Sequence, residues 1–240
     1  MACILNIETS TSVCSVALSQ DGHCIYHEED RTGPNHAERL GTYVDEAMSF
    51  ADSHAIPLDA VAVSMGPGSY TGLRIGVSMA KGICYALNIP LIAVPTLELM
   101  AVPVLLREEF SGADIDPMAE NGAEPLLCPM LDARRMEVYA AIFNRALKPI
   151  RGIQADVVTA DTYRELLDRQ PVYFFGNGAE KCMETINHPN AHLIKDVEPL
   201  AKYMFPLAER RLMRGETEDV AYFTPFYLKD FVALKPKKLI

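Results

Sequence analysis

Two polar turns, each directly after an apolar run, carry residue types that could bind the phosphates and magnesium ion of a nucleotide. The first is Glu8, Thr9 and Ser10, and the second begins at Asp132 and includes Arg134. Carboxylates coordinate magnesium, and small residues let backbone N–H groups approach a phosphate. The second turn lacks glycine and has two consecutive arginines, which could pair with an anion, cover the surface or contact a partner. Either carboxylate could also simply cap its turn.

Two glycine-containing turns follow later apolar runs. Gly66 and Gly68 precede one predicted helix, and Gly176 and Gly178 precede another. Glycine lets a backbone approach an adenine or a ribose closely, although a tight turn without a ligand has the same sequence. Together with the two polar turns, these glycines define a candidate nucleotide cleft.

Residues for catalysis are missing from the sequence. His23 and His27 fall on one predicted strand, roughly 13 Å apart at about 3.3 Å per residue, so they cannot bind one metal ion. The other histidines form no ligand cluster, and no Gly-x-Ser-x-Gly nucleophile motif occurs. We therefore expect no catalytic residue, no metal site and no tightly bound cofactor in this chain.

One predicted helix has an unusual stripe of small residues. Gly72, Gly76 and Ala80 are spaced four apart, and each glycine inside a helix costs about 1 kcal/mol relative to alanine. The stripe could let the helix pack closely within the chain, or it could form a subunit interface shared with the neighbouring helix at 36–53. For the second interpretation, the predicted interface residues are His36, Leu40, Tyr43, Val44, Gly72, Leu73, Gly76 and Ala80.

Composition limits the classes of function. The 240 residues are 49% hydrophobic, and the net charge of −10 opposes direct binding to a phosphate backbone, so a nucleic-acid role needs a basic partner. No apolar run approaches the roughly 20 residues of a membrane-spanning helix, and Glu8 interrupts any signal-peptide core. The six cysteines are scattered without a C-x-x-C motif, as in reduced proteins. We expect a cytoplasmic protein with no membrane contact.

The elements that position these residues follow one order twice. In the first half, periodicity predicts three strands, a helix, a strand, a helix, a strand and a third helix capped by Thr96. Their ranges are 3–7, 13–18, 23–27, 40–51, 60–65, 71–87 and 91–94. The second half repeats the order over strands 126–131, 137–144 and 150–158, helix 161–169, strand 172–175, a helix after Gly178, strand 192–194 and helix 198–214.

This repetition predicts an α/β protein with two βββαβαβα units. The units are 1–105 and 126–240, joined by an acidic loop or linker at 106–125, and the last segment could pack back on the first unit. Two such units facing each other across a cleft describe the actin-like ATPase (ASKHA, ribonuclease H-like) architecture, which by itself does not establish activity.

Five segments, in order along nearly the whole chain, resemble the bacterial TsaB (YeaZ) family. They are ETSTSVCSVAL from Glu8, GPGSYTGLRIGVSMAKG from Gly66, LDARRMEVYAAIF from Leu131, GNGA from Gly176 and PFYLK from Pro225. The resemblance implies an actin-like fold and a role in forming N6-threonylcarbamoyladenosine at position 37 of tRNA. It further implies a non-catalytic platform for the paralogue TsaD, joined by the ATPase TsaE, with ATP and magnesium used by the complex. A homodimer of the isolated chain and tRNA contact mainly through the partner are also implied.

The resemblance accounts for the absent metal ligands. TsaD-like proteins carry an Asn-His-x-x-Gly-His type motif whose two histidines bind a catalytic metal, and Thr96 and Met100 occupy those two positions here. The resemblance thus assigns the metal site to the partner and leaves the candidate cleft of this chain vestigial.

Three alternatives remain open at this stage. One is a stand-alone ATP-dependent kinase or hydrolase that uses Glu8 and Asp132 with magnesium. Another is the peptidase implied by the family's older glycoprotease label. The third is direct RNA binding through the basic tail at Lys235, Lys237 and Lys238.

Overall fold

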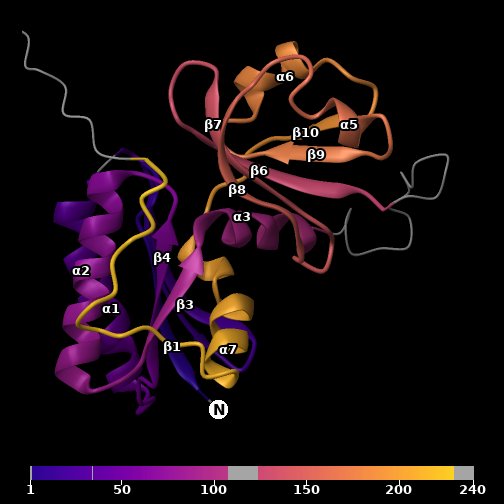
Figure 1. Cartoon of the computed structure of the whole chain (residues 1–240). Helices are drawn as coiled ribbons and strands as arrows, with labels where there is room; N and C mark the ends of the chain where they lie inside the picture. The colour runs from indigo at the N-terminus through magenta and orange to yellow at the C-terminus, as the bar shows by residue number, and fades with distance from the viewer. Residues whose placement is uncertain (1, 34, 108–123, 230–240) are drawn as a thin grey trace, which may run out of the picture.

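The chain folds into two α/β lobes, each built on a five-stranded mixed sheet (Figure 1). The computed structural model describes residues 2–33, 35–107 and 124–229. The first sheet consists of β1 (Cys3–Glu8), β2 (Cys14–Gln20), β3 (His23–Asp30), β4 (Ala60–Gly66) and β5 (Leu91–Pro95), and the second of β6 (Leu126–Asp132), β7 (Glu137–Phe143), β8 (Pro149–Val157), β9 (Val172–Phe175) and β10 (Ala191–Ile194).

The strand orders confirm the predicted duplication. They are β3-β2-β1-β4-β5 in the first sheet and, read from the opposite edge, β8-β7-β6-β9-β10 in the second. In both lobes the first three strands are antiparallel and the last two run parallel to the first. The helices are α1 (His36–Ser53), α2 (Tyr70–Leu87), α3 (Thr96–Leu105), α5 (Arg164–Leu167), α6 (Glu180–Ile186) and α7 (Phe205–Met213), with a 3-10 turn, η1, at Ala201–Tyr203.

Alternation along β1 divides the first lobe into two cores. Leu5 and Ile7 point toward α1 and α2, whereas Ile4 points toward α7, because successive side chains of a strand face opposite sides of a sheet. Helix α2 begins at a Ser69 cap, whose hydroxyl accepts a hydrogen bond from the N–H of Gly72 at 3.2 Å, and ends at Asn88 in the left-handed conformation.

The last helix of each unit packs against the other lobe, and α3 also keeps Leu99 and Val102 in the core of its own lobe. Leu97, Met100 and Val104 of α3 pack into the core beneath the second sheet. Leu207 and Ala208 of α7 pack against the first sheet, on the face opposite α1 and α2 (Figure 1). Residues from 201 onward, which the sequence places in the second unit, therefore complete the core of the first. The predicted single helix at 198–214 is instead η1 followed by α7, with Pro206 in the first turn, where proline is tolerated.

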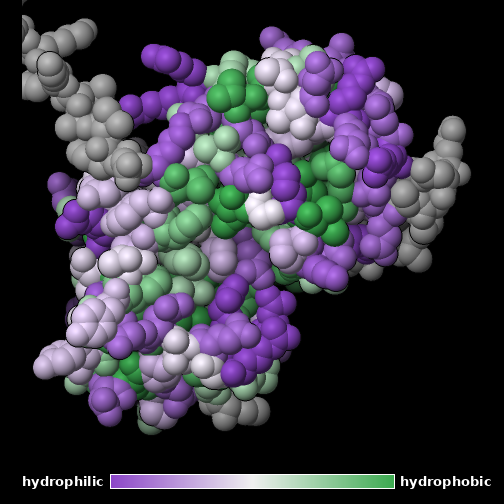
Figure 2. All heavy atoms as spheres, viewed as in Figure 1, coloured by the Kyte–Doolittle hydropathy of each residue, from purple (hydrophilic) through white to green (hydrophobic). Residues whose placement is uncertain are grey.

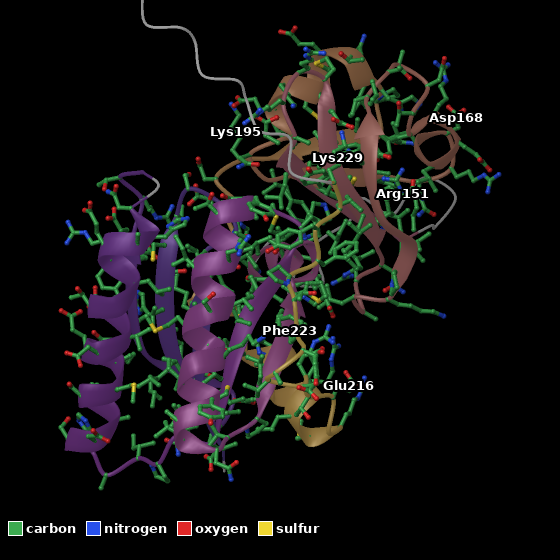
Figure 3. All side chains as sticks on the ribbon, turned by 60° about the vertical axis from the view of Figure 1, so that its left-hand side comes forward. Arg151, Asp168, Lys195, Glu216, Phe223 and Lys229 are labelled. Carbon is green, nitrogen blue, oxygen red and sulfur yellow. The ribbon has the colours of Figure 1, made fainter. Side chains whose placement is uncertain are left out.

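After α7, residues 215–229 form a strap that runs back over the first lobe to the second. The N–H of Glu218 donates to the carbonyl of Leu91 on edge strand β5 at 2.8 Å. Lys81 of α2 donates to two strap carbonyls, and the N–H of Phe226 donates to the carbonyl of Met65 at 2.7 Å. Lys229 then forms an ion pair with Glu137 on β7. Figure 3 shows this course through the labelled residues Glu216, Phe223 and Lys229.

The remaining predictions concern the linker, the thiols and membrane contact. The predicted linker at 106–125 lies mostly outside the described residues. All six cysteines are free thiols, and five are buried. Among the described residues, no helix is long and apolar enough to span a bilayer.

A charge cluster ties α3 and α7 together. Glu98 of α3 accepts hydrogen bonds from Arg210 and Arg211 of α7, both at 2.6 Å, and its side chain is only 10% exposed. Glu98→Gln should lower the free energy of unfolding by about 1–3 kcal/mol, because two partly buried guanidinium groups lose their shared carboxylate. Urea titration measures the change. The control Glu216→Gln, at an exposed carboxylate 3.6 Å from Arg211, should change it by less than about 1 kcal/mol. Equal losses in both variants would contradict this role for Glu98.

Candidate functional site

The glycine stripe of α2 faces the interior of the chain. A Cβ atom at Gly72 would overlap the carbonyl oxygen of Thr9, and one at Gly76 would overlap its hydroxyl oxygen. The Thr9 hydroxyl donates to the carbonyl of Gly72 at 2.8 Å. The glycines therefore let α2 pack against the turn after β1, which is the intramolecular alternative.

The predicted partner interface requires correction for the same reason. Seven of its eight residues are buried within the chain, and only Tyr43 is partly exposed. His36, for example, is 4% exposed, and its Nε2 lies 2.7 Å from the carbonyl oxygen of Thr11. Leu40 and Val44 belong to the core over the first sheet. Spacing identified two close-packed helices but not which face they present to solvent.

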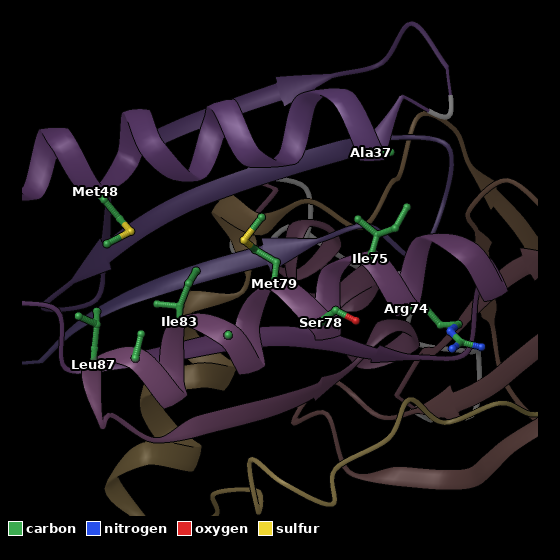
Figure 4. A pocket seen from close by; sticks show the side chains of 10 residues that line it. Ala37, Met48, Arg74, Ile75, Ser78, Met79, Ile83 and Leu87 are labelled. Carbon is green, nitrogen blue, oxygen red and sulfur yellow. The ribbon is translucent and has the colours of Figure 1, made fainter.

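The outer faces of the same helices form an apolar groove of about 770 Å³. Figure 4 shows Met48 reaching down from α1 and Ile75, Met79 and Ile83 rising from α2 between the two helices. The remaining lining residues are Ala37, Arg74, Ser78, Gly82, Ala86 and Leu87. The sequence carries a signal for this surface, because α2 has a second apolar row at 75, 79 and 83 besides its buried row at 73, 77, 80 and 84. A helix that is apolar on two faces is covered on both.

In the first lobe, the polar turn at the end of β1 is closed by the chain itself. Glu8 is fully buried, and it accepts hydrogen bonds from the hydroxyl of Ser64 and, at 2.5 Å, from the N–H of Ser10. The N–H of Ser69 donates to the carbonyl of Ser10 at 2.6 Å, and a Cβ atom at Gly68 would overlap that carbonyl. A Cβ atom at Gly66 would lie 2.6 Å from the carbonyl oxygen of Phe226 in the strap. The predicted phosphate-binding residues are thus together but packed against each other.

The corresponding turn of the second lobe is exposed and rigidly held. The Lys181 ammonium donates to Asp132 at 2.5 Å and to the carbonyl oxygens of Arg135 and Glu137 at 2.6 and 2.8 Å. Although burial acts against it, the hydrogen bond from Lys181 lowers the pKa of Asp132. Arg134 and Arg135 both have positive φ, of 73° and 50°, which costs about 1–2 kcal/mol for each non-glycine residue. Nothing in the residue types of this turn indicates the backbone strain.

The glycines of the second lobe make a tight turn. A Cβ atom at Gly176 would overlap the Met100 methyl group and lie 2.5 Å from the carbonyl oxygen of Met130. One at Gly178 would lie 2.8 Å from the carbonyl carbon of Leu131. Close packing of the chain, rather than the approach of an adenine, accounts for both glycines.

The two positions that the resemblance aligns with histidines of TsaD-like proteins lie in the core between the lobes. Thr96 and Met100 are both fully buried, and the Thr96 hydroxyl has no hydrogen-bond partner in the described structure. Over residues 2–33, 35–107 and 124–229, no three histidine, cysteine, aspartate or glutamate residues gather in a way that could hold a metal ion.

Comparisons with known proteins agree on one family. The family model of TsaD, a tRNA N6-adenosine threonylcarbamoyltransferase, matches residues 30–237. The tRNA threonylcarbamoyladenosine biosynthesis protein TsaB of Escherichia coli is 30% identical over 238 residues, which cover 97% of this chain and 96% of that one. TsaB of Bacillus subtilis is 31% identical over 177 residues, covering 72% and 70% of the two chains. YeaZ from Pseudomonas aeruginosa, a solved structure at 24% identity and a TM-score of 0.71, covers 95% of this chain and 100% of its own, and shares the fold.

The close approach of α2 to Thr9 predicts opposite effects for two glycines of one helix. Gly76→Ala should lower the free energy of unfolding by about 1–3 kcal/mol, because the added methyl group overlaps the Thr9 hydroxyl. Gly82→Ala should raise it by about 0.5–1 kcal/mol, because nothing lies within 4 Å of that Cβ position and alanine favours the helix. Denaturant unfolding of both variants measures the pair, and a stabilising Gly76→Ala would disprove the close contact.

Burial of Glu8 makes the stability of the protein depend on pH. Burial raises its pKa to about 7 from an ordinary value of 4.5, so between these values the folded chain binds more protons than the unfolded chain. The free energy of unfolding should therefore fall as pH rises from 4.5 to 7, by about 3 kcal/mol in total. Glu8→Gln should remove this fall, because the Ser64 hydroxyl can donate to or accept from the amide. Urea titrations of both proteins from about pH 5 to 8 measure it, and parallel pH profiles would contradict the prediction.

Proposed function

We propose that this chain, which belongs to the TsaB family of tRNA threonylcarbamoyladenosine biosynthesis proteins, supports that modification as a subunit without catalytic residues of its own. Membership of the family ties the chain to the formation of threonylcarbamoyladenosine in tRNA. The finer proposal is that it is a scaffold for TsaD, with TsaE as the third subunit, and that it forms a homodimer when TsaD is absent.

The apolar groove between α1 and α2 is the observation that carries this proposal. A row of hydrophobic side chains on the outer face of α2 is solvent-accessible in the isolated chain, and a contiguous apolar surface of this kind is typical of a protein interface. Leu87, at one end of the groove, is 46% exposed, and Arg74 supplies a charged rim at the other end (Figure 4). We assign this groove to TsaD in the complex and to a second copy in the homodimer.

The two polar turns support an accessory role over the kinase or hydrolase alternative. Around Glu8, the donors that could contact a phosphate already donate hydrogen bonds within the chain. The N–H of Ser10 and the hydroxyl of Ser64 donate to Glu8, and the N–H of Ser69 donates to the carbonyl of Ser10. Lys181 neutralises Asp132 in place of a magnesium ion. We therefore propose that ATP and magnesium act on the partners in the complex, and that TsaD provides most of the tRNA contact because this chain is acidic.

A charge placed in the groove tests the proposal. Ala86→Glu should weaken association with purified TsaD of the same organism at least about tenfold, because an unpaired carboxylate would be buried in an apolar interface. Ala146→Glu, the same substitution in the exposed β7–β8 turn, is the control and should have no effect. Size-exclusion chromatography measures association, and nucleoside analysis of tRNA from complemented cells measures the modification. Unchanged association of the Ala86→Glu chain would rule out this interface.

A further inference from the structure

Arg134 and Arg135 differ from the other arginines of the chain. Both side chains are exposed, and neither guanidinium has an ion-pair or hydrogen-bond partner among the described residues. Every other arginine in the described ranges has an interaction partner. Apart from an electrostatic interaction of Arg134 with nearby Asp132, the two adjacent guanidinium groups are therefore available to bind an anion.

The backbone of this turn is poorly suited to arginine. Arg134 and Arg135, both at positive φ, lie in the four-residue connection between β6 and β7. The N–H of Glu137 donates to the carbonyl of Arg134 at 3.1 Å. Asparagine and glycine adopt positive φ with less strain than arginine. Backbone strain at two residues whose guanidinium groups have no hydrogen bond or ion pair among the described residues is typical of a functional position.

The surroundings hold the turn in one conformation. Lys181 bonds to three acceptors in it, and the N–H of Asp132 donates to the side chain of Asn177 at 2.9 Å. At its far side, Lys229 of the strap pairs with Glu137. The arginines are therefore presented by a preorganised turn, which reduces the ordering needed when an anion binds.

Charge is unevenly distributed along the sequence. Residues 124–200, which form the second lobe, contain 9 basic and 11 acidic residues, whereas residues 2–107 contain 5 basic and 11 acidic residues. The net charge of −10 therefore arises mainly outside the second lobe, and the two carboxylates that flank the turn, Asp132 and Glu137, are each paired with a lysine. In the view of Figure 2, hydrophilic residues cover most of the outer rim of this lobe, and hydrophobic residues reach the surface where the lobes meet.

We infer that the β6–β7 turn binds phosphodiester groups of tRNA through the guanidinium groups of Arg134 and Arg135. The inference rests on the proposed function, because tRNA is the substrate of the modification that this chain supports. It adds a contact on the second lobe to those made by TsaD. The contact is to backbone phosphates, so it positions the tRNA without reading its sequence.

The test replaces both arginines by residues that adopt positive φ readily, asparagine and glycine. Arg134→Asn with Arg135→Gly should keep the hairpin and raise Tm by about 4 °C or more, because strain is relieved at two residues, and this distinguishes weaker binding from a failure to fold. The probe is a fluorescent, unmodified tRNA transcript, titrated between about 50 and 200 mM salt with the full chain alone and with its complex with TsaD. The slope of log K against log salt should decrease in magnitude by about two, because each arginine neutralises one phosphate in the wild type.

A matched control removes the same charge elsewhere on the lobe. Arg164→Gln with Arg169→Gln changes two exposed arginines of the α5 region that already pair with Asp168 and Glu165, so the salt slope should not change. Failure of the complex to form would count against the proposed function, while the titration of the full chain alone would still test the turn. An unchanged slope in the Asn-Gly variant, or absence of tRNA binding by wild type in both arms, would overturn the inference. So would a variant that no longer binds TsaD but keeps its tRNA slope, because the arginines would then bind an acidic protein surface.

Discussion

The contact between α2 and the turn after β1 determines the organisation of the first lobe. Because Gly72 and Gly76 lack side chains, the backbone of α2 lies against Thr9 and closes the turn that holds Glu8. The same contact directs one apolar row of α2 into the core and leaves the other row, at 75, 79 and 83, beside α1 on the surface. A closed polar turn and an open apolar groove are thus two results of one close approach between backbones.

The sequence predicts the duplicated fold well because strand and helix periodicity repeats in the same order in both halves. The sequence does not show which side of a helix faces the core, because residue spacing alone does not give the orientation of the helix in the fold. The stripe at Gly72, Gly76 and Ala80 fits either an internal contact or a subunit interface, and only the position of Thr9 decides between them. It also cannot show that α7 packs on the first sheet, since an amphipathic helix fits either lobe equally well.

The sequence predicts which residues share each polar turn but not what fills the turn. Glu8, Ser10 and Gly68 do meet at one turn, and Asp132, Gly176 and Gly178 lie near another, because equivalent strand ends come together in each sheet. Composition could not show that hydrogen bonds within the chain fill the first turn, or that Lys181 holds the second. The positive φ angles of Arg134 and Arg135 could not be predicted either, because left-handed backbone is normally recognised in a sequence by asparagine or glycine.

The packing of α3 and α7 against the opposite lobes has a consequence for how the protein is made. Each half of the sequence encodes the core on one face of its sheet, but the other face of the first sheet is covered only when residues near 205 have been synthesised, and the other face of the second sheet is covered by α3, which precedes it. During synthesis, the first half of the chain leaves the ribosome before α7 has been made. The shared helices therefore couple the folding of the two lobes, since each lobe buries one face of its sheet with a helix from the other half of the chain.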